Sequence, residues 1–204
     1  MKRFAAFSLL FVALRAHADF TLVENFDEAG HVQKVTIFVK GEKVRVENAD
    51  TGRVYIEDFA ERRCFVMSIT KKTYYSGPRV GTPVIREDTN PNIVDTGRQE
   101  KIADYKADIY TIDDQGCVNV LWATKDAPDY ATVTKKLKQL ELNGISTNLM
   151  PIFWKLDALP VKLQLFFNGK ATCTTTLISL KQEPVDDSEF QPPSDYTSTG
   201  PPYR

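Results

Sequence analysis

Short segments in which apolar and polar residues alternate dominate the first half of this chain. Val35, Ile37 and Val39 share one side of the segment 32–40, and in the next segment Val44 and Val46 alternate with Lys43, Arg45 and Glu47. A period of two residues is typical of a strand with one buried face. Turn residues such as Gly41 leave only a few positions between successive segments. Because only antiparallel strands can be joined by such short turns, the sequence predicts an antiparallel meander.

The second half adds one helix and one clear hairpin. Apolar residues recur at helical spacing within 128–142, and Asp126 is the expected N-cap. The Asn168-Gly169 pair is a strong hairpin signal between two alternating segments. The predicted fold class is therefore mainly β (α+β). We expect a curved antiparallel sheet or half-barrel of about nine to eleven strands with one covering helix.

Residues 1–18 have the pattern of a cleaved signal peptide. Lys2 and Arg3 precede an apolar run, 4–14, and an A-x-A site follows at 16–18. A bilayer span needs about 20 apolar residues, so this run is too short for a stable membrane anchor. The sequence thus predicts a periplasmic or secreted protein.

One half-barrel domain is expected over residues 19–182, followed by a Pro-rich tail, 183–204. The tail contains five prolines and little apolar content, so we expect it to be partly disordered, with Phe190 and Tyr196 docked. Loss of the signal peptide leaves 23 basic and 27 acidic side chains. The basic residues are not clustered into a phosphate-binding patch, so nucleic acid is not an expected partner.

The middle of the chain carries a motif. The order T-G-x-x-x-x-I-x-x-Y-x-x-x-x-Y precedes a strand that ends in Trp-Ala. This order resembles a secreted bacterial family of unknown function that is grouped with the lipoprotein-carrier (Lol-type) half-barrels. The likeness extends weakly from Asp19 to Tyr196. It implies a half-barrel and a hydrophobic ligand, but no activity, since the family has none assigned. The matching residues are Thr96, Gly97, Ile102, Tyr105, Tyr110 and Trp122.

The residues themselves give little support for catalysis. After cleavage His31 is the single histidine, so a nucleophile paired with a histidine base has only one candidate. One histidine and three dispersed cysteines are a weak supply of zinc ligands, and no phosphate-binding glycine motif occurs. Chemistry with paired carboxylates stays open, because 27 acidic residues allow many pairs. We expect a non-enzymatic protein with no cofactor and no metal.

Three cysteines, at positions 64, 117 and 173, remain after cleavage. Export permits a disulfide, and an odd number leaves at least one thiol unpaired or paired elsewhere. Cys117 and Cys173 both lie in the C-terminal part of the predicted sheet. We therefore predict that these two form the disulfide.

Two functions are open at this point. A single helix cannot shield about ten strands, so the sheet either curls on itself or leaves an apolar concavity that could hold a lipid or acyl chain. The alternative is a filled core in an envelope structural or interaction protein, which binds a protein through an edge strand or its Pro-rich tail. The predicted lining of a ligand site is Phe65, Met67, Val118, Val120, Trp122, Leu163, Leu165 and Phe167.

Overall fold

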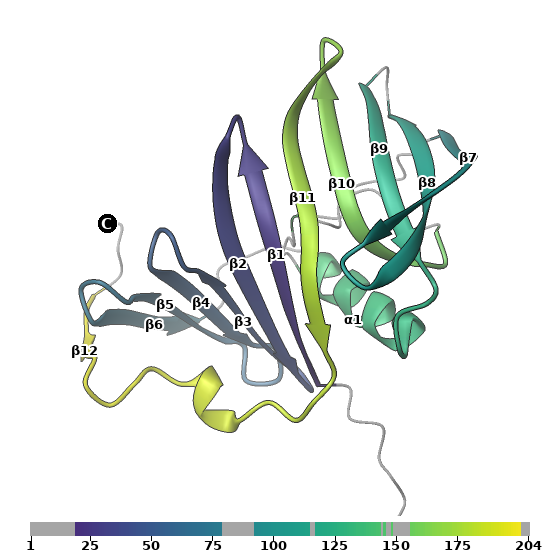
Figure 1. Cartoon of the computed structure of the whole chain (residues 1–204). Coiled ribbons are helices and arrows are strands. Elements are labelled where there is room, and N and C mark those ends of the chain that lie inside the picture. The colour runs from purple at the N-terminus through teal and green to yellow at the C-terminus, as the bar shows by residue number, and fades with distance from the viewer. Residues whose placement is uncertain are drawn as a thin grey trace, which may run out of the picture.

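The chain forms one curved sheet of twelve strands with a single α-helix in the described residues (Figure 1). The computed structural model describes residues 19–78, 92–114, 117–143, 145, 148 and 156–200. The strand order is β12-β6-β5-β4-β3-β2-β1-β11-β10-β9-β8-β7. The strands are β1 (Phe20–Glu28), β2 (His31–Lys40), β3 (Lys43–Asn48), β4 (Arg53–Asp58), β5 (Arg63–Ser68), β6 (Thr73–Pro78), β7 (Asn92–Ile102), β8 (Tyr105–Asp114), β9 (Cys117–Thr124), β10 (Leu159–Phe167), β11 (Lys170–Lys181) and β12 (Thr197–Ser198).

Antiparallel pairing of neighbours in sequence builds most of this order. Strands β1 to β6 form one meander, β7 to β11 form a second run, and β1 joins the two by pairing with β11. The exception is β12, which pairs parallel with β6. The predicted mainly β class, the antiparallel sheet and the single helix are confirmed. The count of twelve slightly exceeds the predicted range, and β12 comes from the predicted tail.

Helix α1 (Tyr130–Leu142) begins later than the sequence suggested. Its N-cap is Asp129, at φ 45°, and the side chain of this residue makes no capping hydrogen bond. The predicted N-cap, Asp126, is therefore wrong; its backbone N–H instead donates to the Thr124 hydroxyl. The helix is held by its apolar stripe, because packing rather than capping supplies most helical stability in proteins. Val133, Leu137 and Leu140 are all buried.

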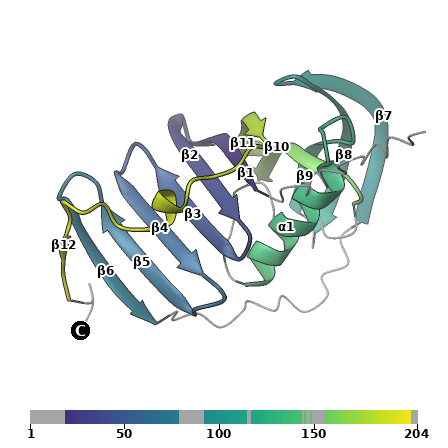
Figure 2. The same ribbon diagram turned by 90° about the horizontal axis from the view of Figure 1, so that it is seen from below.

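Strand alternation gives the sheet two faces with different covers (Figure 2). On what we call the helix face, side chains such as Ile37 and Val39 pack in one core with α1. On the opposite tail face, Ile56 pairs with Phe65 in the register of β4 and β5. A second, smaller core forms there beneath the C-terminal segment. It consists of Val54, Ile56, Phe65, Met67, Val185 and Phe190.

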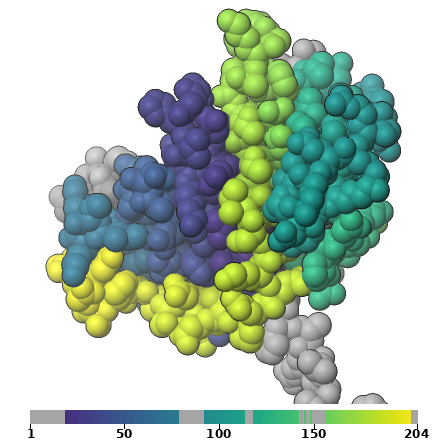
Figure 3. Space-filling view, viewed as in Figure 1, coloured from purple at the N-terminus to yellow at the C-terminus, as the bar shows by residue number. Residues whose placement is uncertain are grey.

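The C-terminal segment, residues 183–200, lies along the sheet in Figures 1 and 3. Its short 3-10 helix, η1 (Asp187–Phe190), brings Phe190 into the second core, where only 1% of its surface is exposed. Tyr196 packs against the same core. The sequence predicted a partly disordered tail with Phe190 and Tyr196 docked, and the structure places both side chains in or against the second core. Residues 201–204 lie outside the described ranges.

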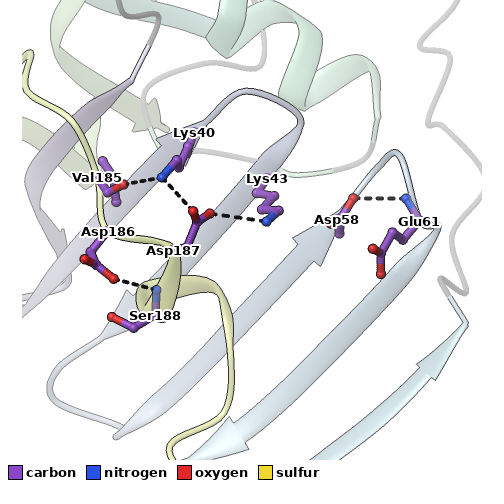
Figure 4. Close-up of polar contacts among 8 residues, drawn as sticks. All are labelled: Lys40, Lys43, Asp58, Glu61, Val185, Asp186, Asp187 and Ser188. Carbon is purple, nitrogen blue, oxygen red and sulfur yellow. Dashed lines mark hydrogen bonds and ion pairs between the residues drawn. The ribbon is translucent and has the colours of Figure 1, made fainter.

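Ion pairs fix the same segment across β2 and β3 (Figure 4). The Lys40 ammonium donates to the Val185 carbonyl at 2.8 Å and lies 3.2 Å from the Asp187 carboxylate. Lys43 lies 3.4 Å from the same carboxylate. The hydrogen bond from Lys40 holds the pKa of Asp187 below its usual value. Because Asp187 is largely exposed, these pairs direct the segment more than they stabilise it.

The predicted signal peptide, residues 1–18, lies outside the described ranges. Within those ranges, no helix is both long enough and apolar enough to cross a bilayer.

The tail anchor can be tested by truncating Phe190. We expect Phe190→Ala to lower the free energy of unfolding by about 3 kcal/mol, because it empties a buried aromatic site. Phe167→Ala is the matched control, since Phe167 is 64% exposed and its truncation leaves no cavity. Urea unfolding of both variants gives the comparison. Equal small losses would contradict the anchoring role.

Candidate functional site

The eight residues predicted to line one apolar site do not come together. Phe65 and Met67 lie on the tail face, in the core beneath the C-terminal segment. Val118 and Phe167 are exposed, at 49% and 64%. None of these four contributes to the core that α1 covers.

The remaining four residues are split between the two faces. Leu163 pairs with Leu121, and the adjacent pair is Lys162 with Trp122. Since neighbouring residues of a strand point to opposite faces, Trp122 and Val120 lie on the face opposite to Leu163 and Leu165. Leu163 and Trp122 are buried among core residues. The grouping of all eight residues into one site is therefore wrong.

The Trp122 side chain is held by polar contacts with neighbouring strands. Its indole N–H donates to a Glu100 carboxylate oxygen at 2.7 Å, and the Lys162 ammonium lies 4.2 Å from the ring centroid. Glu100 and Lys162 belong to β7 and β10. The indole therefore links three strands and is 6% exposed.

The motif residues build an irregularity in β7. Gly97 has φ 65°, a backbone conformation that favours glycine, and the pairing with β8 shifts between Asp95 and Gln99. The Thr96 hydroxyl donates to the Ile109 carbonyl at 2.7 Å. Ile102 is buried, and both tyrosines of the motif pack against the main core. The motif therefore shapes an edge strand.

The predicted disulfide between Cys117 and Cys173 is wrong. Cys173 carries a free thiol, and its strand β11 pairs with β1 and β10. Strand β10 thus separates it from β9, where Cys117 lies. Cys64 is also free. Burial raises the pKa of both the Cys64 and the Cys173 thiol, so neither is an activated nucleophile.

A buried acid, Glu24, was not identified from the sequence. It lies on the helix face of β1 with no exposed surface, and the Asn148 side-chain amide donates to its Oε1 at 2.7 Å. Its Oε2 has no hydrogen-bond partner among the described residues. Burial raises its pKa to about 7. The sequence did contain one indication of this burial: Glu24 falls on the same face of its strand as the apolar residues Phe20 and Leu22.

The described pocket lies on the tail face, between the end of the sheet and the C-terminal segment. It is open and has a volume of about 400 Å³. The Arg63 guanidinium lies 5.6 Å from the centroid of the Phe65 ring, which packs edge-on against Tyr74 at 6.2 Å. The lining residues are Arg63, Phe65, Tyr74, Ser76, Gln191, Pro192, Pro193, Ser194, Tyr196 and Ser198.

Among the described residues, the edge of the sheet beside this pocket is covered along only two of the six residues of β6. Strand β12 pairs with Thr73 and Tyr74, the first two residues of β6. The backbone N–H groups of Thr197 and Thr199 donate to the carbonyls of Lys72 and Tyr74 at 2.9 and 2.7 Å. In the part of the chain that the structure describes, no strand pairs with the outer side of β6 beyond Tyr74.

The described ranges contain no group of three or more His, Cys, Asp or Glu side chains that could hold a metal ion. The end of the sheet at β6 has instead an edge strand and an adjoining pocket, which is lined by one cation and three aromatic rings.

The sequence matches the family model described as a domain of unknown function (DUF4412) over residues 24–196. The chain belongs to this family. The resemblance to a family without an assigned function is thereby confirmed, and no curated protein matches the sequence.

Solved structures share the fold at low sequence identity. The complex of MucA and MucB from Pseudomonas aeruginosa is 12% identical, with a TM-score of 0.53, covering 87% of this chain and 56% of that one. A second MucB complex, with MucA(peri), is 11% identical, with a TM-score of 0.50 and coverages of 87% and 55%. PNGF-II is 13% identical, with a TM-score of 0.42 and coverages of 90% and 31%. The chain thus spans about half of MucB and under a third of PNGF-II, and the MucB likeness shows the fold alone.

The buried acid makes stability depend on pH. The pKa of Glu24 is about 7 in the folded protein against a usual 4.5, so the folded state binds this proton more tightly than the unfolded state. Stability should therefore fall by about 3 kcal/mol as pH rises from about 4.5 to about 7, and stay level above that. Glu24→Gln should remove this loss.

Urea unfolding at about pH 5 and about pH 8 measures the effect. Glu28→Gln is the control, because Glu28 is an exposed acid on the same strand. A stability difference between the Glu24→Gln variant and the parent that is the same at both pH values would contradict the assignment.

Proposed function

We propose that this protein is a non-enzymatic module of the periplasm or the secreted fraction that binds an extended polypeptide segment at the outer edge of β6. The observation that carries the proposal is the short cover on that edge: β12 has only two residues, whereas β6 has six. Exposed edge strands bind other chains by strand addition, in which backbone hydrogen bonds supply the affinity.

The backbone geometry of β6 suits strand addition. The Tyr74 carbonyl points outward, since it accepts from the Thr199 N–H. Hydrogen-bonding groups alternate along a strand between its two sides, so Ser76 presents its N–H and carbonyl on the same outer edge. An added strand that continues past Tyr74 would pair with these groups.

The cover on this edge can leave while the buried anchor of the segment stays in place. Thr197 and Ser198 are both exposed, and a surface ion pair of 2.8 Å between Lys72 and Asp195 supports their backbone bonds. The fully buried anchor of the segment, Phe190, precedes them by several residues, whereas Tyr196 is only half-buried against the second core. Release of β12 would therefore open the edge and leave Phe190 in its buried site.

The opposite edge of the sheet is protected. Strand β7 is irregular between Asp95 and Gln99 and carries four exposed charged side chains, Asp95, Arg98, Glu100 and Lys101. Bulges and charges are the usual means by which proteins block strand addition. This contrast favours β6 as the edge for a partner.

A protein partner also agrees with the comparison. The solved structures of MucB that share this fold hold it in complex with MucA. At 11–12% identity this likeness supports a polypeptide partner for the present chain without locating its binding site.

The edge can be tested with the chain's own segment as the probe. A full-length variant with Thr197→Pro and Thr199→Pro loses the two backbone donors of β12. We expect a labelled peptide of residues 191–200 to bind this variant with a Kd below about 1 mM, measured by fluorescence polarisation. Binding to the parent protein should be weaker, because its own segment occupies the edge.

The matched control is the same peptide with proline at positions 197 and 199. This control peptide should not bind, since it lacks the donors that pair with β6. Equal binding of both peptides, or of neither, would contradict strand addition at this edge.

A hydrophobic ligand is the second candidate, and one surface of the helix face favours it. The register brings Tyr55, Val66 and Tyr75 side by side across β4, β5 and β6. Val66 is 38% exposed, and both tyrosines are half-buried. An acyl chain could cover these side chains.

Mass spectrometry of an organic extract of the purified protein separates the two candidates. If the polypeptide proposal holds, we expect no acyl chain at stoichiometric amounts. An equimolar lipid that is lost in a Val66→Asp variant would instead support the hydrophobic ligand. The matched variant Val32→Asp, at another exposed valine, should leave the extract unchanged.

A further inference from the structure

The C-terminal segment pairs an acidic side chain with nearly every cation it meets on the tail face. Lys40 and Lys43 lie 3.2 and 3.4 Å from Asp187. Arg45 lies 3.6 Å from Glu189. The docked segment is therefore complementary in charge to the strands beneath it.

Arg63 is the exception within the described residues. Its nearest carboxylate belongs to Glu61, at 3.9 Å, and both side chains are mostly exposed. The guanidinium instead lies over the Phe65 ring at the edge of the pocket. Its hydrogen-bonding capacity is therefore available to a ligand, since an arginine fork can bind a carboxylate through two parallel hydrogen bonds.

The register shows which position of an added strand would reach this guanidinium. Ser198 pairs with Tyr74, and both line the pocket. Because side chains repeat on one face every two residues, a strand that continued this pairing would place its next residue on that face, position 200, beside Ser76. Ser76 pairs with Phe65, and the Arg63 guanidinium lies over the Phe65 ring. In this chain β12 ends at Ser198 and position 200 is glycine, where a Cβ would meet nothing within 4 Å, so the protein's own segment puts no side chain at this position.

We propose that Arg63, Phe65 and Tyr74 form a specificity pocket for an acidic side chain of the partner strand. That residue lies two positions after the one that pairs with Tyr74. The inference rests on the proposed function, in that it names the partner as an extended segment with Asp or Glu at this position. Phe65 holds the guanidinium over its ring, and the partner carboxylate takes the place that Gly200 leaves empty.

The test uses the full-length chain and its own segment. Gly200→Glu places the carboxylate at the proposed position, and Gly200→Gln is the uncharged control of similar shape. The readout is hydrogen exchange at the Thr199 amide, which donates to β6. We expect the glutamate variant to exchange about two- to five-fold more slowly than the glutamine variant, as suits a partly exposed ion pair.

The same comparison in an Arg63→Gln background should show no difference between glutamate and glutamine. The charge-reversed pair, Arg63→Glu with Gly200→Lys, should slow exchange relative to Arg63→Glu alone. Equal exchange of the glutamate and glutamine variants, or an advantage of glutamate that survives Arg63→Gln, would overturn the inference. This readout is intramolecular, so a failure of peptide binding in trans would remove the proposed function and leave the charge preference measurable.

Discussion

The pairing of β1 with β11 is the contact on which the rest of the structure depends. Each half of the chain builds a run of strands from local hairpins, but only this pairing joins the two runs into one sheet. It connects residues far apart in the sequence, such as Leu22 and Leu180. Such a contact costs chain entropy before it stabilises anything, so it requires extensive burial on both strands. Phe20, Leu22 and Leu177 supply that burial against α1.

A sheet this wide has consequences for how its faces are covered. One helix of thirteen residues shields the middle of the helix face, and the C-terminal segment shields the other face at the far end. The two covers differ in kind. Helix α1 buries a continuous apolar stripe, whereas the segment relies on Val185 and Phe190 with ion pairs between them. The end of the sheet beyond these anchors, at β6 and β12, is therefore the least constrained part of the described tail face.

Local patterns predicted the strands and the hairpins because those depend on neighbours in sequence. The Asn168-Gly169 turn is an example: both residues have positive φ, at 49° and 72°, as a two-residue hairpin requires. The predicted site failed because it depended on register between strands. Both faces of β9 are apolar, and only its pairing with β10 shows that Trp122 and Leu163 lie on opposite faces. The cysteine pairing failed for the same reason, since strand order places β10 between the two strands.

Composition alone describes the tail incompletely, because it averages over residues that act singly. Its apolar content is low, yet Phe190 alone fills a buried site against the sheet. The carboxylate of Asp187, which pairs with Lys40 and Lys43 beside it, is largely exposed, and such surface pairs contribute about 0–1 kcal/mol each. Their main effect is on the register of the segment. A segment shifted by one position would leave carboxylates and cations without partners, and this loss disfavours the shifted position. On this surface apolar anchors set whether a segment binds, and the spacing of charges sets which segment binds.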